Sequence, residues 1–227
     1  MREFENLGIS EGVEATAKLY NDIAVRAENL VSESYASARR KVSFPIDINV
    51  VAKHLGIKVD KEHLNLDGVV NFSRKLGVVT SASDGGVRIV VDDAVSYKTQ
   101  RYAIANGVGR YLLNDSKAIF KNTYAIPLIP QSLDEIAADS IAVFLLMPVT
   151  TFKDEFLQYL IMHKEYPMDV DVWLGHLSDK CQITPFNLAI GYQQMKQVLC
   201  YQRQVEFEKN DYDIGRMRED KYDRIFA

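Results

Sequence analysis

Two polar side chains interrupt an otherwise apolar helix pattern in the stretch YAIANGVGRYLL, from Tyr102 to Leu113. Asn106 and Arg110 are four residues apart, a spacing that places both side chains on one edge of a helix. Gly107 and Gly109 lie between them, and each costs about 1 kcal/mol in a helix relative to alanine. A buried helix with this composition must gain something other than helix propensity from these four residues.

The side chains that most often bind metals or act as nucleophiles are sparse. The histidines are His54, His63, His163 and His176. No two of them have HxxxH or HxH spacing and each falls in a different expected element, so we expect surface or structural roles for all of them. Cys181 and Cys200 lack CxxC spacing, and we expect reduced, buried thiols rather than nucleophiles or a disulfide.

The overall composition excludes several classes of protein. The chain has 227 residues, of which 47% are hydrophobic, and a formal net charge of -4, so no global attraction to nucleic acid or to an anionic membrane is expected. GxSxG, Walker and dinucleotide-binding fingerprints are absent. The N-terminus lacks an apolar signal core and the run IAVFLLMPV is too short to span a bilayer, which predicts a soluble cytoplasmic protein.

The first half of the chain predicts two helices, a small sheet and a third helix. A long amphipathic helix is expected from Ser10 to Arg40, and a short one begins at Asp47 or Asn49 and ends at Gly56. The run at 57–59 predicts a short strand, and β-branched runs between positions 66 and 92, with a turn at 84–86, predict a small antiparallel sheet. The helix that carries Asn106 follows from about 96 to 114.

The second half predicts helices only. One begins at the Ser132–Glu135 capping box and ends at Pro148, and a second covers 150–164. A helix–turn–helix pair follows, with Thr184 as the second N-cap. The inner face expected for the first of these helices consists of Leu133, Ile136, Ala137, Ser140, Ile141, Phe144 and Leu145. We therefore expect an α+β protein with an N-terminal helix (1–41), a core (42–165), a C-terminal helical pair (166–202) and a charged helical extension or loose tail (203–227).

The order of these pieces resembles the ImmA/IrrE family of zinc metallopeptidase-like proteins over roughly Ile46 to Gln197. The resemblance is carried by PIDINVVAKHLGIKV, by the strand VRIVVDD that leads into KTQRYAIANGVGRYLL, and by AADSIAVFLLMP. It implies a zincin-like core, in which the helix with Asn106 packs against a small antiparallel sheet, and a helical C-terminal subdomain.

The resemblance also explains the polar pair. The family's HExGH motif, whose histidines bind one zinc and whose glutamate activates water, falls on residues 106–110. Asn106 is a poor zinc ligand, Gly107 has no side chain, and Arg110 carries a permanent positive charge that repels a cation. Only Gly109 matches the motif. The resemblance therefore implies a degenerate site with no catalytic residue and no metal cofactor.

The family's third zinc ligand is a carboxylate early in the later helix. Alignment on LLMP puts Ala137 at that position, with Asp134 and Glu135 slightly upstream. Glu135 serves equally well as a capping carboxylate. We hypothesise that Arg110 points into the former metal slot and pairs with Asp134, Glu135 or Asp139, since a buried guanidinium needs an acidic partner. The alternative is a rotated helix with Arg110 on the surface.

These observations favour a pseudopeptidase that binds another protein instead of cleaving it. The resemblance implies a repressor-like or toxin–antitoxin-type partner, as in phage or mobile-element regulation, and no membrane partner. One alternative is an active zinc metallopeptidase with ligands relocated to the histidines and nearby carboxylates.

A second alternative is a DNA-binding regulator that uses the C-terminal helix pair. Its second helix would present Asn187, Gln193 and Gln194 but little positive charge beyond Lys196, which argues against nucleic acid as a partner.

Overall fold

The computed structural model describes residues 13–64, 75–81, 85–113, 119–121, 133–162 and 170–226. Within these ranges the chain forms helices and one four-stranded sheet, so the expected α+β class is confirmed.

The N-terminal elements follow the sequence signals closely. Helix α1 spans Val13–Ser37 and helix α2 spans Ile48–His54. Asp47 is the N-cap of α2, and its carboxylate accepts a hydrogen bond from the backbone N of Asn49 at 3.2 Å. Gly56 has a φ of 72°, which glycine adopts without strain, and the chain turns there into strand β1, Ile57–Glu62. The proposed N-cap Ser10 lies outside the described residues.

The sheet is mixed rather than antiparallel. Strands β2 (Lys75–Ser81), β3 (Val87–Asp92) and β4 (Ile119–Lys121) join β1 in the order β1-β3-β2-β4. Strand β2 is antiparallel to β3 and β4, but β1 runs parallel to β3, from Ile57↔Val87 to Glu62↔Asp92. The expected antiparallel sheet is therefore only part of a mixed sheet, because a β-branched run such as 57–59 identifies a strand without indicating its direction.

Helix α3, Tyr97–Leu112, lies between the sheet and helix α4, Leu133–Leu146. Ser96 caps α3, and its hydroxyl accepts a hydrogen bond from the backbone N of Thr99 at 3.3 Å. Every residue of α3 from 100 to 110 is buried, because neighbouring elements cover both of its faces.

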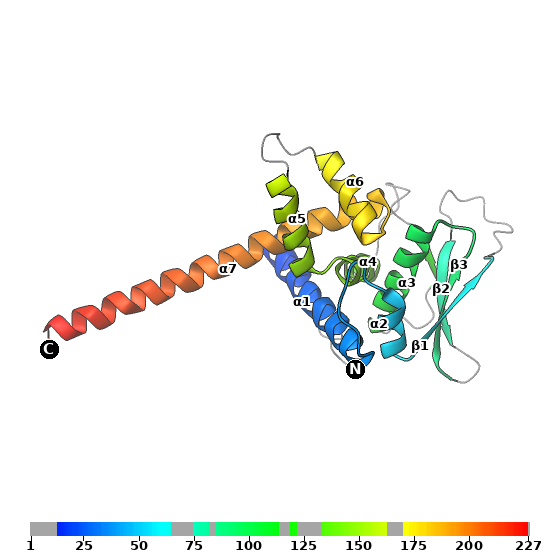
Figure 1. Ribbon diagram of the computed structural model, residues 1–227. Coiled ribbons are helices and arrows are strands. Elements are labelled where there is room, and N and C mark those ends of the chain that lie inside the picture. The colour runs from blue at the N-terminus through cyan, green and yellow to red at the C-terminus, as the bar shows by residue number, and fades with distance from the viewer. Residues whose placement is uncertain are drawn as a thin grey trace.

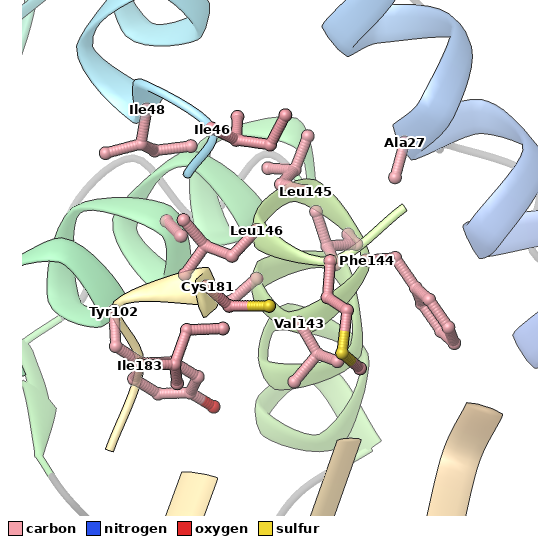
Figure 2. Packing of buried hydrophobic residues seen from close by; sticks show 14 of the residues in the cluster. Ala27, Ile46, Ile48, Tyr102, Val143, Phe144, Leu145, Leu146, Cys181 and Ile183 are labelled. Carbon is pink, nitrogen blue, oxygen red and sulfur yellow. The ribbon is translucent and has the colours of Figure 1, made fainter. Parts of the chain in front are cut away.

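Helix α4 occupies the centre of the protein. All its residues from Ala137 onward are buried, including the expected inner-face residues of that stretch, because α1, α3 and the last helix surround α4. Figure 2 shows the side chains of Val143, Phe144, Leu145 and Leu146 leaving the α4 axis in different directions within this core. A helix enclosed in this way is apolar all round.

The remaining helices are α5 (Val149–Met162), α6 (Val170–Cys181) and α7 (Pro185–Phe226). Thr184 is the N-terminal cap of α7, as expected, since its hydroxyl accepts a hydrogen bond from the backbone N of Asn187 at 3.4 Å. Of the two expectations for 203–227, a helix extension is the one observed up to Phe226. Figure 1 shows α5 and α6 at the top of the view, above α4, and the C-terminal half of α7 projecting as a long arm.

In the described part of the chain, no helix by itself combines the length and the apolar character needed to cross a membrane. Helices α4 and α5 satisfy that test only as a pair, across a bend of 59°.

Candidate functional site

Four polar side chains from α3 and α4 meet in the interior. Asn106 and Arg110 lie one turn apart on α3, and Asp139 and Glu135 lie one turn apart on α4. The Asn106 amide donates a hydrogen bond from Nδ2 to Asp139 Oδ1 at 2.6 Å, and Arg110 Nε donates to Asn106 Oδ1 at 3.0 Å. Arg110 Nη2 lies 4.0 Å from Glu135 Oε1. We call these four residues the α3–α4 polar cluster.

The cluster is largely shielded from water. Asn106, Arg110 and Asp139 are 5%, 7% and 5% exposed, whereas the side chain of Glu135 is 28% exposed at the outer edge. A buried carboxylate is costly without partners. Asp139 has two neutral donors, because the Tyr102 hydroxyl donates to the same oxygen, Oδ1, at 2.9 Å. The amide of Asn106 thus connects the buried carboxylate to the guanidinium of Arg110.

The geometry tests the two expectations for Arg110. The guanidinium lies beside an acidic side chain at the start of α4, namely Glu135, as hypothesised. It reaches Asp139 through Asn106, and the side chain of Asp134 lies outside the described residues. The alternative of a rotated helix with Arg110 on the surface is wrong, since α3 is enclosed by the sheet and α4. Ala137, the aligned third-ligand position, is a buried core residue with no donor atom.

The candidate site residues identified from the sequence did not include Tyr102. Tyr102, Asn106 and Arg110 recur every four residues, so they share one stripe of α3, and this spacing is the signal that would have included the tyrosine.

The two glycines allow α3 to approach its neighbours. A Cβ on Gly109 would lie 2.7 Å from the backbone O of Ala138 on α4. A Cβ on Gly107 would lie 2.9 Å from Ile89 Cδ1 on β3. The glycines therefore contribute close packing on both faces of α3, and Gly109 allows the two halves of the α3–α4 polar cluster to meet.

The chemical inventory of the cluster is an amide, a guanidinium and two carboxylates. The two carboxylates are potential metal ligands, but the guanidinium beside them already supplies positive charge and disfavours a metal cation at the same place. Position 107 provides no general base, because glycine has no side chain. The arrangement is suited to holding two helices together and lacks the ligands and base of a hydrolytic zinc site.

The described histidines lie away from the cluster. His176 Nε2 is 3.6 Å from Glu155 Oε2 and its ring stacks on Trp173, while His54 is exposed on α2. His63 Nδ1 is 3.5 Å from Asp93 Oδ1, and the ligand atoms of His63, Asp92 and Asp93 all lie within 4.8 Å of one another. His163 lies outside the described residues.

The two cysteines differ from each other. Burial raises the pKa of the Cys181 thiol to about 12, and Glu155 nearby adds to the effect, so this thiol stays protonated and unreactive at neutral pH. Cys200 is exposed on α7, which makes the expectation of burial wrong for this residue. Its position on the outer side of a helix explains the difference.

The helix pair α6–α7 does not present the polar residues that DNA reading would use. Asn187 and Gln194 are 2% and 5% exposed, and Gln194 Nε2 donates to Ser140 Oγ on α4 at 3.0 Å. The DNA-binding alternative requires these two side chains to face outward, but they lie on the face of α7 that packs on the central helix. Gln193 and Lys196 are exposed.

The sequence matches no family model, and no curated protein matches it either. The resemblance to the ImmA/IrrE family therefore stays a hypothesis based on the order and spacing of the quoted motifs.

Proposed function

We propose that this protein is a non-catalytic relative of zinc metallopeptidases, with a zincin-like core, that acts by binding another protein. The observation that carries the proposal is the α3–α4 polar cluster. Asn106 and Arg110 stand at the positions where the resemblance places two zinc-binding histidines, and both are engaged with carboxylates of α4.

The charge of the cluster supports the loss of the metal. Arg110 supplies a fixed positive charge next to Glu135 in a site shielded from water. A guanidinium cannot lose its proton in a protein, so it would not act as a zinc ligand at any physiological pH. We infer that Arg110 replaces the electrostatic role of a zinc ion and keeps α3 docked on α4.

The class of partner rests on the resemblance alone. Relatives implied by the motifs act on transcriptional repressors, including those of phages and mobile elements. A scaffold of this type without a base or a metal would hold such a repressor, or a toxin–antitoxin-type protein, without cutting it. We propose the cytoplasm as the place of action, and no nucleic acid or membrane as a direct partner.

The first experiment measures metal binding at the cluster in a His63→Ala background, because His63 belongs to a separate group of ligand atoms. We expect the His63→Ala variant to carry no zinc after desalting, as measured by native mass spectrometry. Introducing Asn106→His with Arg110→His should create binding of one zinc ion, with Glu135 or Asp139 as a third ligand. The control replaces the same two residues with glutamine, which offers the space without imidazoles.

The second experiment co-expresses the protein with a candidate repressor and reads the complex by intact mass. A full-length partner held at a 1:1 ratio supports the proposal. Metal-dependent shortening of the partner at one defined bond would overturn it in favour of an active peptidase. Failure of the histidine pair to bind zinc in a folded variant would contradict the zincin-like placement of Asn106 and Arg110.

A further inference from the structure

A second group of polar side chains lies where β3 ends, before α3 begins. It consists of His63, which follows β1, and of Asp92 and Asp93 at the end of β3. We call these three residues the β1–β3 end group. Because β1 and β3 are parallel neighbours, their carboxyl ends meet at the same edge of the sheet.

The backbone holds the β1–β3 end group in place. Asp93 N donates a hydrogen bond to the carbonyl O of Glu62 at 3.1 Å, which fixes the end of β3 against the end of β1. Gln100 Nε2, from the first turns of α3, donates to the carbonyl O of Asp93 at 3.2 Å. Two strands and one helix thus fix the backbone positions of these three residues.

The group combines a buried carboxylate with two accessible ligands. Asp92 is 0% exposed, whereas the side chains of His63 and Asp93 are 71% and 50% exposed. Asp92 is held in place by the backbone, since its Oδ1 accepts a hydrogen bond from the backbone N of Ala94 at 3.0 Å. A divalent cation would be attracted by the two adjacent carboxylates in addition to the contacts they already make, and the exposed side chains of His63 and Asp93 leave it a route from solvent.

We propose that His63, Asp92 and Asp93 bind one divalent transition-metal ion, with Zn²⁺ as the best match. One imidazole nitrogen and two carboxylate oxygens form a mixed donor set that zinc accepts, and water completes the coordination. Three atoms separated by at most 4.8 Å surround a point no more than roughly 2.8 Å from each, so each ligand moves inward by roughly 0.7 Å to reach zinc-binding distance. His63 and Asp93 are exposed and can make that adjustment by side-chain rotation.

The bound ion stabilises the sheet and takes no part in hydrolysis. It links the ends of β1 and β3 just before α3 begins. Tyr97, where α3 begins, precedes Asn106 by nine residues, or roughly 14 Å along the helix axis, so the ion is remote from the α3–α4 polar cluster. The proposal is therefore independent of the proposed function.

The test is titration of the metal-free full-length protein with Zn²⁺ by isothermal calorimetry, with Mn²⁺ and Mg²⁺ as comparison ions. We expect one Zn²⁺ per chain, tighter than either comparison ion, and a melting temperature that rises with Zn²⁺ until the site is full. His63→Ala and Asp93→Asn should each weaken Zn²⁺ binding by at least about tenfold, since each removes one of three protein ligands.

The matched control is His54→Ala, which removes an exposed histidine from α2 and should leave Zn²⁺ binding unchanged. The Asp92 carboxylate is left intact, because a change at a fully buried position can prevent folding. Absence of Zn²⁺ binding to the wild-type chain at about 100 µM metal overturns the proposal. Equal binding by wild type, His63→Ala and Asp93→Asn overturns it as well, because the zinc would then lie elsewhere.

Discussion

Gly107 and Gly109 have the same low helix propensity, but at the residue scale they contact different parts of the protein. Gly109 meets the backbone of Ala138, which cannot move without separating α3 from α4. Gly107 meets the side chain of Ile89, whose atoms can shift within the core. Both gain helix propensity on mutation to alanine, so the difference between them reports the packing alone.

We predict that Gly109→Ala lowers the free energy of unfolding by about 1–3 kcal/mol, because the added methyl group overlaps a backbone carbonyl. Gly107→Ala should stay within about 1 kcal/mol of wild type, since the helix-propensity gain offsets the displacement of Ile89. Urea denaturation followed by circular dichroism measures both. Equal loss in the two variants would show that α4 accommodates the methyl group by moving.

Arg101 shows at the element scale how a single side chain connects three segments. It is 5% exposed, and its guanidinium donates to the carbonyl oxygens of Ile46, Cys181 and Gln182, at 2.6, 3.3 and 3.3 Å. These acceptors are the chain before α2 and the C-terminal end of α6. A cation at a helix C-terminus also interacts favourably with the helix dipole.

We predict that Arg101→Ala lowers the free energy of unfolding by about 2–4 kcal/mol, because it leaves three carbonyl groups without their donor. Lys98→Ala is the matched control. Lys98 also joins α3 to α6, through Asp179 at 2.8 Å, but the Asp179 side chain is 82% exposed. A solvent-exposed pair contributes about 0–1 kcal/mol. Chemical denaturation measures the free energy of unfolding of both variants. Similar losses of this free energy in the two variants would contradict the prediction for Arg101.

Helix α7 joins two environments at the scale of the whole molecule. Its first turns pack on α4, where a Cβ on Gly191 would lie 2.4 Å from Val143 Cγ1. Farther along, Gln202 Nε2 donates to Asn21 Oδ1 of α1 at 2.9 Å, and Lys153 of α5 donates to Gln202 Oε1 at 2.9 Å. Beyond this point the helix projects away from the other elements (Figure 1).

We predict that removing 207–227 changes the melting temperature by less than about 4 °C, because the deleted part lies in the projecting arm and a loss of about 1 kcal/mol shifts a chain of this size by only a few degrees. Removing 201–227 instead should lower it by more, since Gln202 is lost along with its contacts to α1 and α5. Differential scanning calorimetry compares the two. An equally large drop for the shorter deletion would mean that the arm packs on the molecule.

Local signals in the sequence identified most elements and one half of the site. Asp47, Gly56, Ser96 and Thr184 mark helix ends by local hydrogen bonds or backbone conformation, and these depend on neighbouring residues only. The i, i+4 spacing placed Asn106 and Arg110 on one edge of α3 for the same reason. The partners Glu135 and Asp139 were expected only as a set with Asp134, because the rotation of α4 against α3 is a tertiary property.

The sequence by itself determined the α+β class, the helix caps and the placement of Asn106 and Arg110 on one edge of a helix that contains Gly107 and Gly109. Only the tertiary structure decided the parallel pairing of β1 with β3, the enclosure of α4, the choice of Glu135 beside Arg110, and the meeting of His63 with Asp92 and Asp93. The physical reason is the distance along the chain over which each interaction acts. Propensity and capping act within about one helical turn, whereas these four features arise from contacts between segments far apart in the chain.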